Sequence, residues 1–162
     1  MRTIHFRHYN NCPRCPVIGA EDIPGDEFYE ILSLRFNIRI ARDLCSSHVP
    51  HLVNRPPLER WLEHAVIDWE HVDHLPLSLG PGIMATLPGG CGMPVIDGNH
   101  RAARAMRDRH DFFAFVLDEA ETQQLLRRSM DRSIADQHWQ RMLHSKPHPK
   151  DVQPAVQEGE QS

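Results

Sequence analysis

The stretch "PVIDGNHRAARAMRDRHDFFAFVLDEAE", from Pro94 to Glu121, gives the clearest structural signals in the sequence. An apolar run ends in Asp97-Gly98, an alanine-rich segment follows, and a second apolar run comes after it. Glycine permits a tight turn, and small side chains allow a helix to lie close to a sheet. The stretch therefore predicts a strand, a helix over residues 99–108 with Asp97 as its N-cap, and an interior strand over residues 111–117.

The residues upstream show both strand and helix periodicity. Alternating apolar residues in 31–41 predict one half-exposed strand. A helix is expected from Arg55 to near Ile67, where early prolines precede apolar residues at helical spacing. Residues 70–79 predict a short strand, and residues 82–97 predict a hairpin with a Pro-Gly-Gly turn. The apolar face expected for the alternating strand consists of Leu32, Leu34, Phe36, Ile38 and Ile40.

Taken together, these elements indicate the α+β class, with a small mixed sheet and packed helices. The length of 162 residues suits one domain, which we expect over residues 1–144, beginning with weak strand character in residues 2–9. Residues 119–143 predict one long charged helix. Residues 145–162 contain too few apolar side chains to offset the cost of ordering, so they predict a flexible tail.

The charge and hydropathy patterns exclude some classes of partner. The formal net charge is -4 and the pI is about 6.3, so any nucleic acid would have to bind a local basic patch. No apolar run is long enough to cross a bilayer, and the first residues lack the apolar core of a secretion signal. We therefore expect a cytoplasmic protein without a membrane partner, and the oligomeric state is left open.

The Asp97-Gly98 turn before the helix expected over residues 99–108 has the composition of an anion-binding site. A helix start leaves backbone N–H groups without intrahelical partners, Gly98 allows close approach, and Arg101 adds a permanently charged fork. We predict a phosphate site formed by Gly98, Asn99, His100 and Arg101. In it, His100 contacts a phosphate or carries a proton, and Asp97 holds magnesium or orients a water or hydroxyl. The alternative is that Asp97 only caps the helix while His100 and Arg101 are solvated.

The motif "VIDGNHRAARAM", followed by the strand "FFAFVLDE", resembles the core of the ParB/sulfiredoxin-like superfamily. The resemblance covers residues 66–126 and leaves residues 1–65 as an N-terminal β elaboration. Members of this superfamily receive nucleotide phosphates at the equivalent helix start: ParB partition proteins hydrolyse CTP, sulfiredoxins use ATP and free serine kinases use ADP. The Asp-Gly-x-His-Arg form is nearer the kinase and sulfiredoxin branches than the partition proteins.

The resemblance implies an enzyme that uses magnesium together with ATP, ADP or CTP. It would hydrolyse a nucleoside triphosphate or transfer its phosphoryl group, with Asp97 and His100 as catalytic residues. Two departures narrow this expectation. Asn99 stands where sulfiredoxins have a cysteine, so reduction of sulfinic acid is not expected. Partition proteins carry a helix-turn-helix domain after the nucleotide domain, and the sequence here ends in a long helix and a tail, so centromere binding is not expected either.

Other functions stay open beside the nucleotide enzyme. The chain could be a non-enzymatic module, plasmid- or phage-borne, that binds a protein or DNA. It could also be a metal-dependent DNase of the same fold, because some plasmid-encoded members of the superfamily resemble nucleases. The basic face that would contact DNA consists of Arg127, Arg128, Arg132 and Arg141.

The cysteines add a candidate metal site outside this core. Cys12 and Cys15 form a C-x2-C pair, and Cys45 and His48 form a C-x2-H pair. Zinc prefers such thiolate and imidazole ligands in a tetrahedral arrangement, so the spacing predicts a closed structural zinc site if the two pairs meet. The alternative is that the cysteines are reduced thiols, as is usual in a chain without an export signal.

Overall fold

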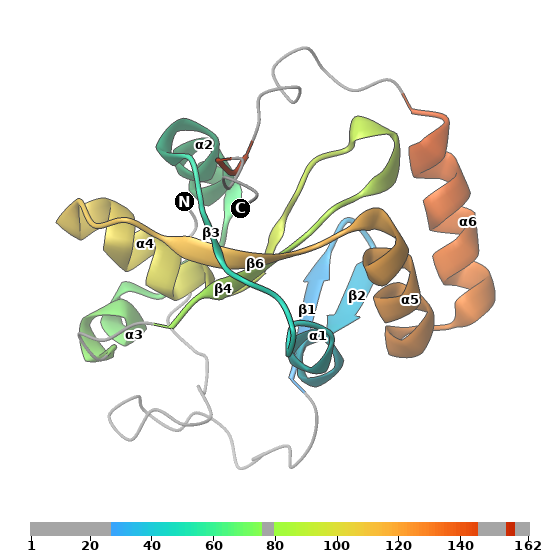
Figure 1. Ribbon diagram of the computed structural model, residues 1–162, viewed down its shortest axis with the longest axis horizontal. Coiled ribbons are helices and arrows are strands. Elements are labelled where there is room, and N and C mark those ends of the chain that lie inside the picture. Colours follow the sequence, from blue (N-terminus) through green and yellow to red (C-terminus); the bar gives the residue numbers. More distant parts are fainter. Residues whose placement is uncertain (1–26, 76–79, 146–154, 158–162) are drawn as a thin grey trace.

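A computed structural model describes residues 27–75, 80–145 and 155–157 of the chain. The described residues form an α+β structure, in which a small mixed sheet lies between two groups of helices (Figure 1). This confirms the fold class expected from the sequence. The weak strand expected at residues 2–9 lies outside the described residues.

The central sheet contains four strands in the order β3 (His51–Leu52), β6 (Phe113–Leu117), β4 (Gly82–Ala85) and β5 (Val95–Asp97). Strands β4 and β6 are parallel, whereas the β3–β6 and β4–β5 pairs are antiparallel. Because β6 lies between β3 and β4, the prediction of an interior strand is confirmed. The β4–β5 hairpin is also confirmed, and its connection includes a short 3₁₀ helix, η1 (Pro88–Gly90).

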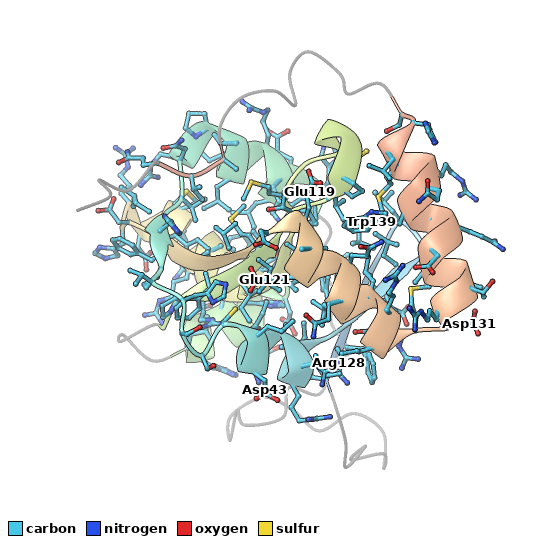
Figure 2. The ribbon with its side chains drawn as sticks, turned by 45° about the vertical axis from the view of Figure 1, so that its right-hand side comes forward. Asp43, Glu119, Glu121, Arg128, Asp131 and Trp139 are labelled. Atoms are coloured by element: carbon cyan, nitrogen blue, oxygen red, sulfur yellow. The ribbon has the colours of Figure 1, made fainter. Side chains whose placement is uncertain are left out.

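The sheet separates two apolar cores because alternate side chains of each strand point to opposite faces. Ile83 and Ala85 of β4 belong to the first core, and Met84 between them belongs to the second. The first core is covered by α1 (Ile38–Leu44), α5 (Glu119–Ser129) and α6 (Arg132–Leu143), and Trp139 of α6 is buried in it (Figure 2). The second core is covered by α2 (Arg55–His64), α3 (Trp69–His74) and α4 (Asn99–Asp108).

The prediction of one strand over residues 31–41 was wrong. The chain instead forms a hairpin of β1 (Phe28–Ile31) and β2 (Leu34–Asn37), followed directly by α1. Leu32 and Ser33 make the turn with φ angles of 50° and 65°, and Leu32 is 75% exposed rather than on an apolar face. Asn37 then starts α1, because its side chain accepts a hydrogen bond from the N–H of Ile40.

Two further predictions differ from the structure, and in each case a side chain caps the start of a helix. In the strand expected at residues 70–79, residues 70–74 belong instead to α3, and residues 76–79 lie outside the described residues. The start of α3 is fixed by the Asp68 carboxylate, which accepts from the N–H groups of Glu70 and His71. The single long helix expected over residues 119–143 is two helices, α5 and α6. Met130 is extended between them, and the Asp131 side chain caps α6.

The helices predicted over residues 99–108 and from Arg55 onward are confirmed as α4 and α2, although α2 ends at His64 rather than near Ile67. Part of the tail that was expected to be flexible lies along β3. The N–H of Asn54 donates to the carbonyl of Ala155 at 2.8 Å, and the N–H of Gln157 donates to β3 at 3.0 Å. No helix in the described ranges is long and apolar enough to cross a membrane.

Candidate phosphate-binding site

The predicted phosphate site lies at the junction of β5 and α4. Gly98 connects them in the left-handed conformation, with φ 96° and ψ 20°, and a Cβ at this position would lie 3.0 Å from the Cα of Gly82. This position therefore needs glycine for its backbone angles and for the close approach to β4. The expectation that Asp97 caps α4 was wrong, because Gly98 is the N-cap residue and no side chain caps this helix.

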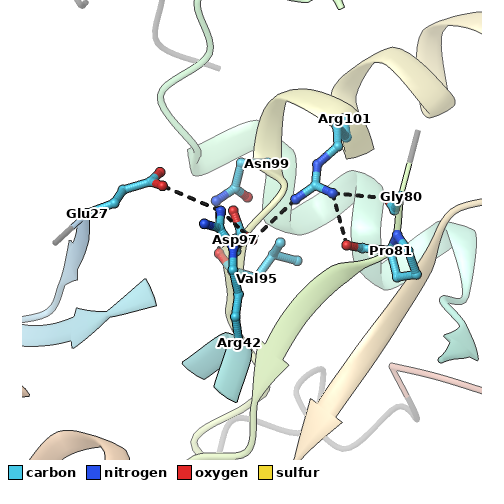
Figure 3. A network of polar contacts seen from close by, with 8 residues as sticks. All are labelled: Glu27, Arg42, Gly80, Pro81, Val95, Asp97, Asn99 and Arg101. Carbon is cyan, nitrogen blue, oxygen red and sulfur yellow. Dashed lines mark hydrogen bonds and ion pairs between the residues drawn. The ribbon is translucent and has the colours of Figure 1, made fainter. Parts of the chain in front are cut away.

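The Asp97 carboxylate instead contacts two arginine side chains. Its Oδ2 atom lies 3.3 Å from Nη2 of Arg101, and 3.4 Å and 3.3 Å from Nε and Nη2 of Arg42 (Figure 3). The Asp97 side chain is 12% exposed, whereas that of Arg42 is 54% exposed and also reaches Glu27 at 3.5 Å. Two guanidinium groups, from α1 and α4, thus converge on one carboxylate oxygen at the end of β5.

Arg101 is held over the junction rather than solvated. Its Nη1 atom donates to the carbonyl oxygens of Gly80 and Pro81 at 3.0 Å and 2.9 Å, immediately before β4 (Figure 3). Its Nη2 atom faces Asp97, and only 22% of the side chain is exposed. The guanidinium therefore lies close to the start of α4, as the phosphate-site prediction requires, but in this conformation it is paired with a carboxylate.

The side chain of Asn99 has a packing role. It is 8% exposed, its Nδ2 donates to the carbonyl of Val95 at 2.8 Å, and its Oδ1 accepts from Nε1 of Trp61 at 2.7 Å. These bonds attach the first turn of α4 to β5 and to α2. Only the backbone N–H of Asn99 is then suited to binding a phosphate, as expected for a residue in the first helical turn.

The His100 ring connects α4 to α3. Its Nε2 atom accepts a hydrogen bond from the backbone N–H of Asp68 at 3.1 Å, and the ring lies edge-on to that of His71 with centroids 5.1 Å apart. Burial lowers the pKa of His71 and outweighs the opposing effect of the Asp68 charge. An acceptor at Nε2 places the proton of neutral His100 on Nδ1, so a proton-carrying role would have to use Nδ1.

Only half of the predicted zinc site can be described, because Cys12 and Cys15 lie outside the described residues. Cys45 is 5% exposed in the first core, and burial, followed by the charges of Glu121 and Asp97, raises the pKa of its thiol to about 11. Within the described ranges, no group of three or more His, Cys, Asp or Glu side chains could hold a metal ion. The zinc site therefore stays a prediction.

The second described zinc candidate, His48, already has a carboxylate neighbour. Its Nε2 atom lies 2.8 Å from Oε2 of Glu121, and Glu121 also completes the capping box of α5 with Asp118. Binding of zinc through Nε2 would therefore require His48 to leave Glu121.

One of the arginines expected to form a basic face pairs with an acidic side chain. Arg127 donates to the Asp136 carboxylate at 2.7 Å and thereby joins α5 to α6. A shallow, open hollow on α6 contains both basic and acidic groups. Helix α6 lies on the opposite side of the molecule from α4 (Figure 1). The residues that line this hollow are Arg132, Ser133, Asp136, Gln137, Gln140 and Arg141.

Sequence reasoning missed three residues that shape the β5–α4 junction: Arg42, Trp61 and Asp68. Each contacts a residue of the predicted site from a different element or connection. Arg42 is separated from Asp97 by 55 positions, and no local pattern marks that pairing. The helical spacing of residues after Arg55 places Trp61 with the apolar residues of α2, but it does not place Trp61 against Asn99.

Comparison with known proteins does not assign the chain to a family. No family description, no curated protein and no solved structure matches it. The resemblance to the ParB/sulfiredoxin-like superfamily therefore stays a prediction that rests on residues 66–126.

Proposed function

We propose that the chain binds the phosphates of a nucleotide at the β5–α4 junction and hydrolyses a nucleoside triphosphate or transfers its phosphoryl group. The observation that carries this proposal is the convergence of Arg42 and Arg101 on Asp97, directly beside the uncapped start of α4. Guanidinium groups and the N–H groups of a helix start are both donors that suit phosphate oxygens.

In this proposal, the phosphate replaces the carboxylate oxygen on Arg101. Nη1 of Arg101 stays bonded to the carbonyls of Gly80 and Pro81, which keeps the guanidinium in place, and the ligand takes over from Asp97 as the acceptor at Nη2. Gly98 allows the phosphate to approach the backbone, since a side chain here would occupy the space near Arg101. The pre-positioned fork reduces the entropy lost on binding.

Asp97 is suited to magnesium once it is released from the arginines. Magnesium is commonly held by one or two carboxylates together with phosphate oxygens and waters, so a single carboxylate at the junction meets this requirement. Bound there, magnesium would neutralise charge on the transferring phosphoryl group. His100 would hold or move a proton at Nδ1, because its Nε2 accepts from the N–H of Asp68.

The proposal is tested by calorimetry and thermal shift with ATP, ADP, CTP and GTP, each with and without magnesium. At least one nucleotide should raise the melting temperature, since a ligand that binds only the folded state stabilises it. Arg101→Ala should abolish binding and Arg101→Lys should retain part of it, because lysine keeps the charge but not the fork. Arg39→Ala is the matched control, since Arg39 lies on α1, as Arg42 does, and pairs with Asp43.

Catalysis is followed as release of inorganic phosphate, and DNA cleavage as release of acid-soluble nucleotides with and without magnesium. Phosphate release that is lost in Asp97→Asn would support the enzyme. No thermal shift and no calorimetric heat with any of the four nucleotides would overturn the proposal. DNA cleavage without nucleotide binding would assign the junction to a nuclease instead.

A further inference from the structure

Arg42 is the charged group at the junction that no sequence pattern indicated. It belongs to α1, which follows the β1–β2 hairpin and covers the first core. Its side chain reaches Asp97 at the end of β5. Its side chain is 54% exposed, so it has a free path to solvent and to a ligand. Its contacts with Asp97 and Glu27, at 3.3 to 3.5 Å, are longer than ordinary charge-assisted hydrogen bonds.

Two guanidinium groups and two carboxylates meet around Asp97, and the two carboxylates differ in their exposure to water. One carboxylate oxygen serves two guanidinium groups, and the other acid in contact with Arg42, Glu27, is 61% exposed and therefore well screened by water. Two cations close together repel one another, and an additional anion relieves that repulsion.

We propose that Arg42 is a second phosphate contact, so that the junction selects a chain of two or three phosphates over a single phosphate. This inference rests on the proposed phosphate site. An anion on Arg101 and the start of α4 reaches Arg42 only by extending past Asp97, because the carboxylate lies between the two guanidinium groups (Figure 3). With Asp97 still paired to Arg42, a single phosphate that takes the place of the carboxylate on Arg101 contacts Arg101 alone, whereas a pyrophosphate or tripolyphosphate spans both.

The test is isothermal titration of the full chain with orthophosphate, pyrophosphate and tripolyphosphate in magnesium-free buffer. We expect tripolyphosphate to bind the unmodified chain at least tenfold more tightly than orthophosphate. Arg42→Ala should weaken tripolyphosphate about five- to tenfold and leave orthophosphate within twofold, as expected for one lost charged contact. Arg39→Ala, which removes the same charge from the same helix, should change neither affinity, and Arg42→Gln serves as a second variant with a polar side chain.

The outcomes separate this inference from the proposed function. If Arg42→Ala weakens orthophosphate and tripolyphosphate equally, or weakens neither, Arg42 is not a second contact, whether or not nucleotides bind. If the unmodified chain binds no phosphate compound, both proposals fall. If tripolyphosphate binding depends on Arg42 but none of the four nucleotides binds, Arg42 is a second phosphate contact and the nucleotide function is refuted. A circular dichroism melt of each variant verifies that it is folded.

Discussion

The substitution Asp97→Asn should change stability and anion affinity in opposite directions. In the structure the Asp97 carboxylate is the internal partner of Arg42 and Arg101, with both Nη2 atoms at 3.3 Å. The pair with Arg101 is largely buried and the pair with Arg42 is half exposed. Removing the negative charge should therefore cost about 1 to 3 kcal/mol, mostly from the Arg101 pair, because exposed pairs contribute only about 0 to 1 kcal/mol.

The same carboxylate competes with a bound phosphate for the guanidinium groups. Two unit charges about 4 Å apart interact by roughly 4 kcal/mol at an effective dielectric constant of about 20, and by about 1 kcal/mol in water. The Arg42 side of the junction is half exposed, so the lower value applies there. Removing the carboxylate charge should strengthen magnesium-free binding of tripolyphosphate about fivefold, which corresponds to about 1 kcal/mol.

Urea denaturation measures the first effect and titration calorimetry at low ionic strength measures the second. With magnesium present, the same variant should lose phosphate release, because asparagine is a weaker magnesium ligand than a carboxylate. If Asp97→Asn weakened magnesium-free tripolyphosphate binding, the carboxylate would support the ligand site rather than compete for it. The idea that phosphate replaces Asp97 on the arginines would then be refuted.

Three further substitutions test the fold by urea denaturation. Replacing Leu32-Ser33 with Asn-Gly should stabilise the chain by about 1 to 2 kcal/mol, because both residues have positive φ, which Asn and Gly adopt more readily. Gln157→Pro should destabilise it by about 1 kcal/mol, while Gln157→Ala, which keeps the N–H donated to β3, should not. Asn99→Ala should cost about 2 to 4 kcal/mol, more than Trp61→Phe, since only the former removes both hydrogen bonds of the Asn99 side chain.

The sequence predicted the β5–α4–β6 unit well because its signals are local. Gly98 lies between an apolar run and an alanine-rich run, and each run has the periodicity of one element. The interior position of β6 also followed from its composition, since apolar residues on both faces require cover on both faces. Only the N-cap was assigned to the wrong residue, because Gly98 takes the N-cap position and the Asp97 carboxylate pairs with Arg42 and Arg101 instead.

The errors lie where one side chain or a tertiary contact overrides a periodic pattern. The alternation of residues 31–41 is real, but the chain turns at Leu32 and Ser33, which are residues that seldom adopt positive φ. The long helix breaks after Ser129, whose hydroxyl donates to the carbonyl of Leu125 and accepts from the N–H of Asn37 on β2. That bond spans 92 positions, and no window of sequence contains it.

The same distinction bears on function. The Asn99 and His100 side chains each have a packing partner, so their presence at the start of α4 is explained by the fold alone. The junction of Asp97 with two arginines is not explained in this way, because one ion pair would suffice to hold Arg101 beside β5, and a half-exposed second pair adds little stability. The fold therefore does not depend on the Arg42 ion pair, and the charge of Arg42 is available to a ligand. The position of Arg42 depends on the β1–β2 hairpin and α1. The β1–β2 hairpin and α1 are for this reason part of the proposed site, and loss of the hairpin should remove polyphosphate selectivity before it removes the binding of a single phosphate.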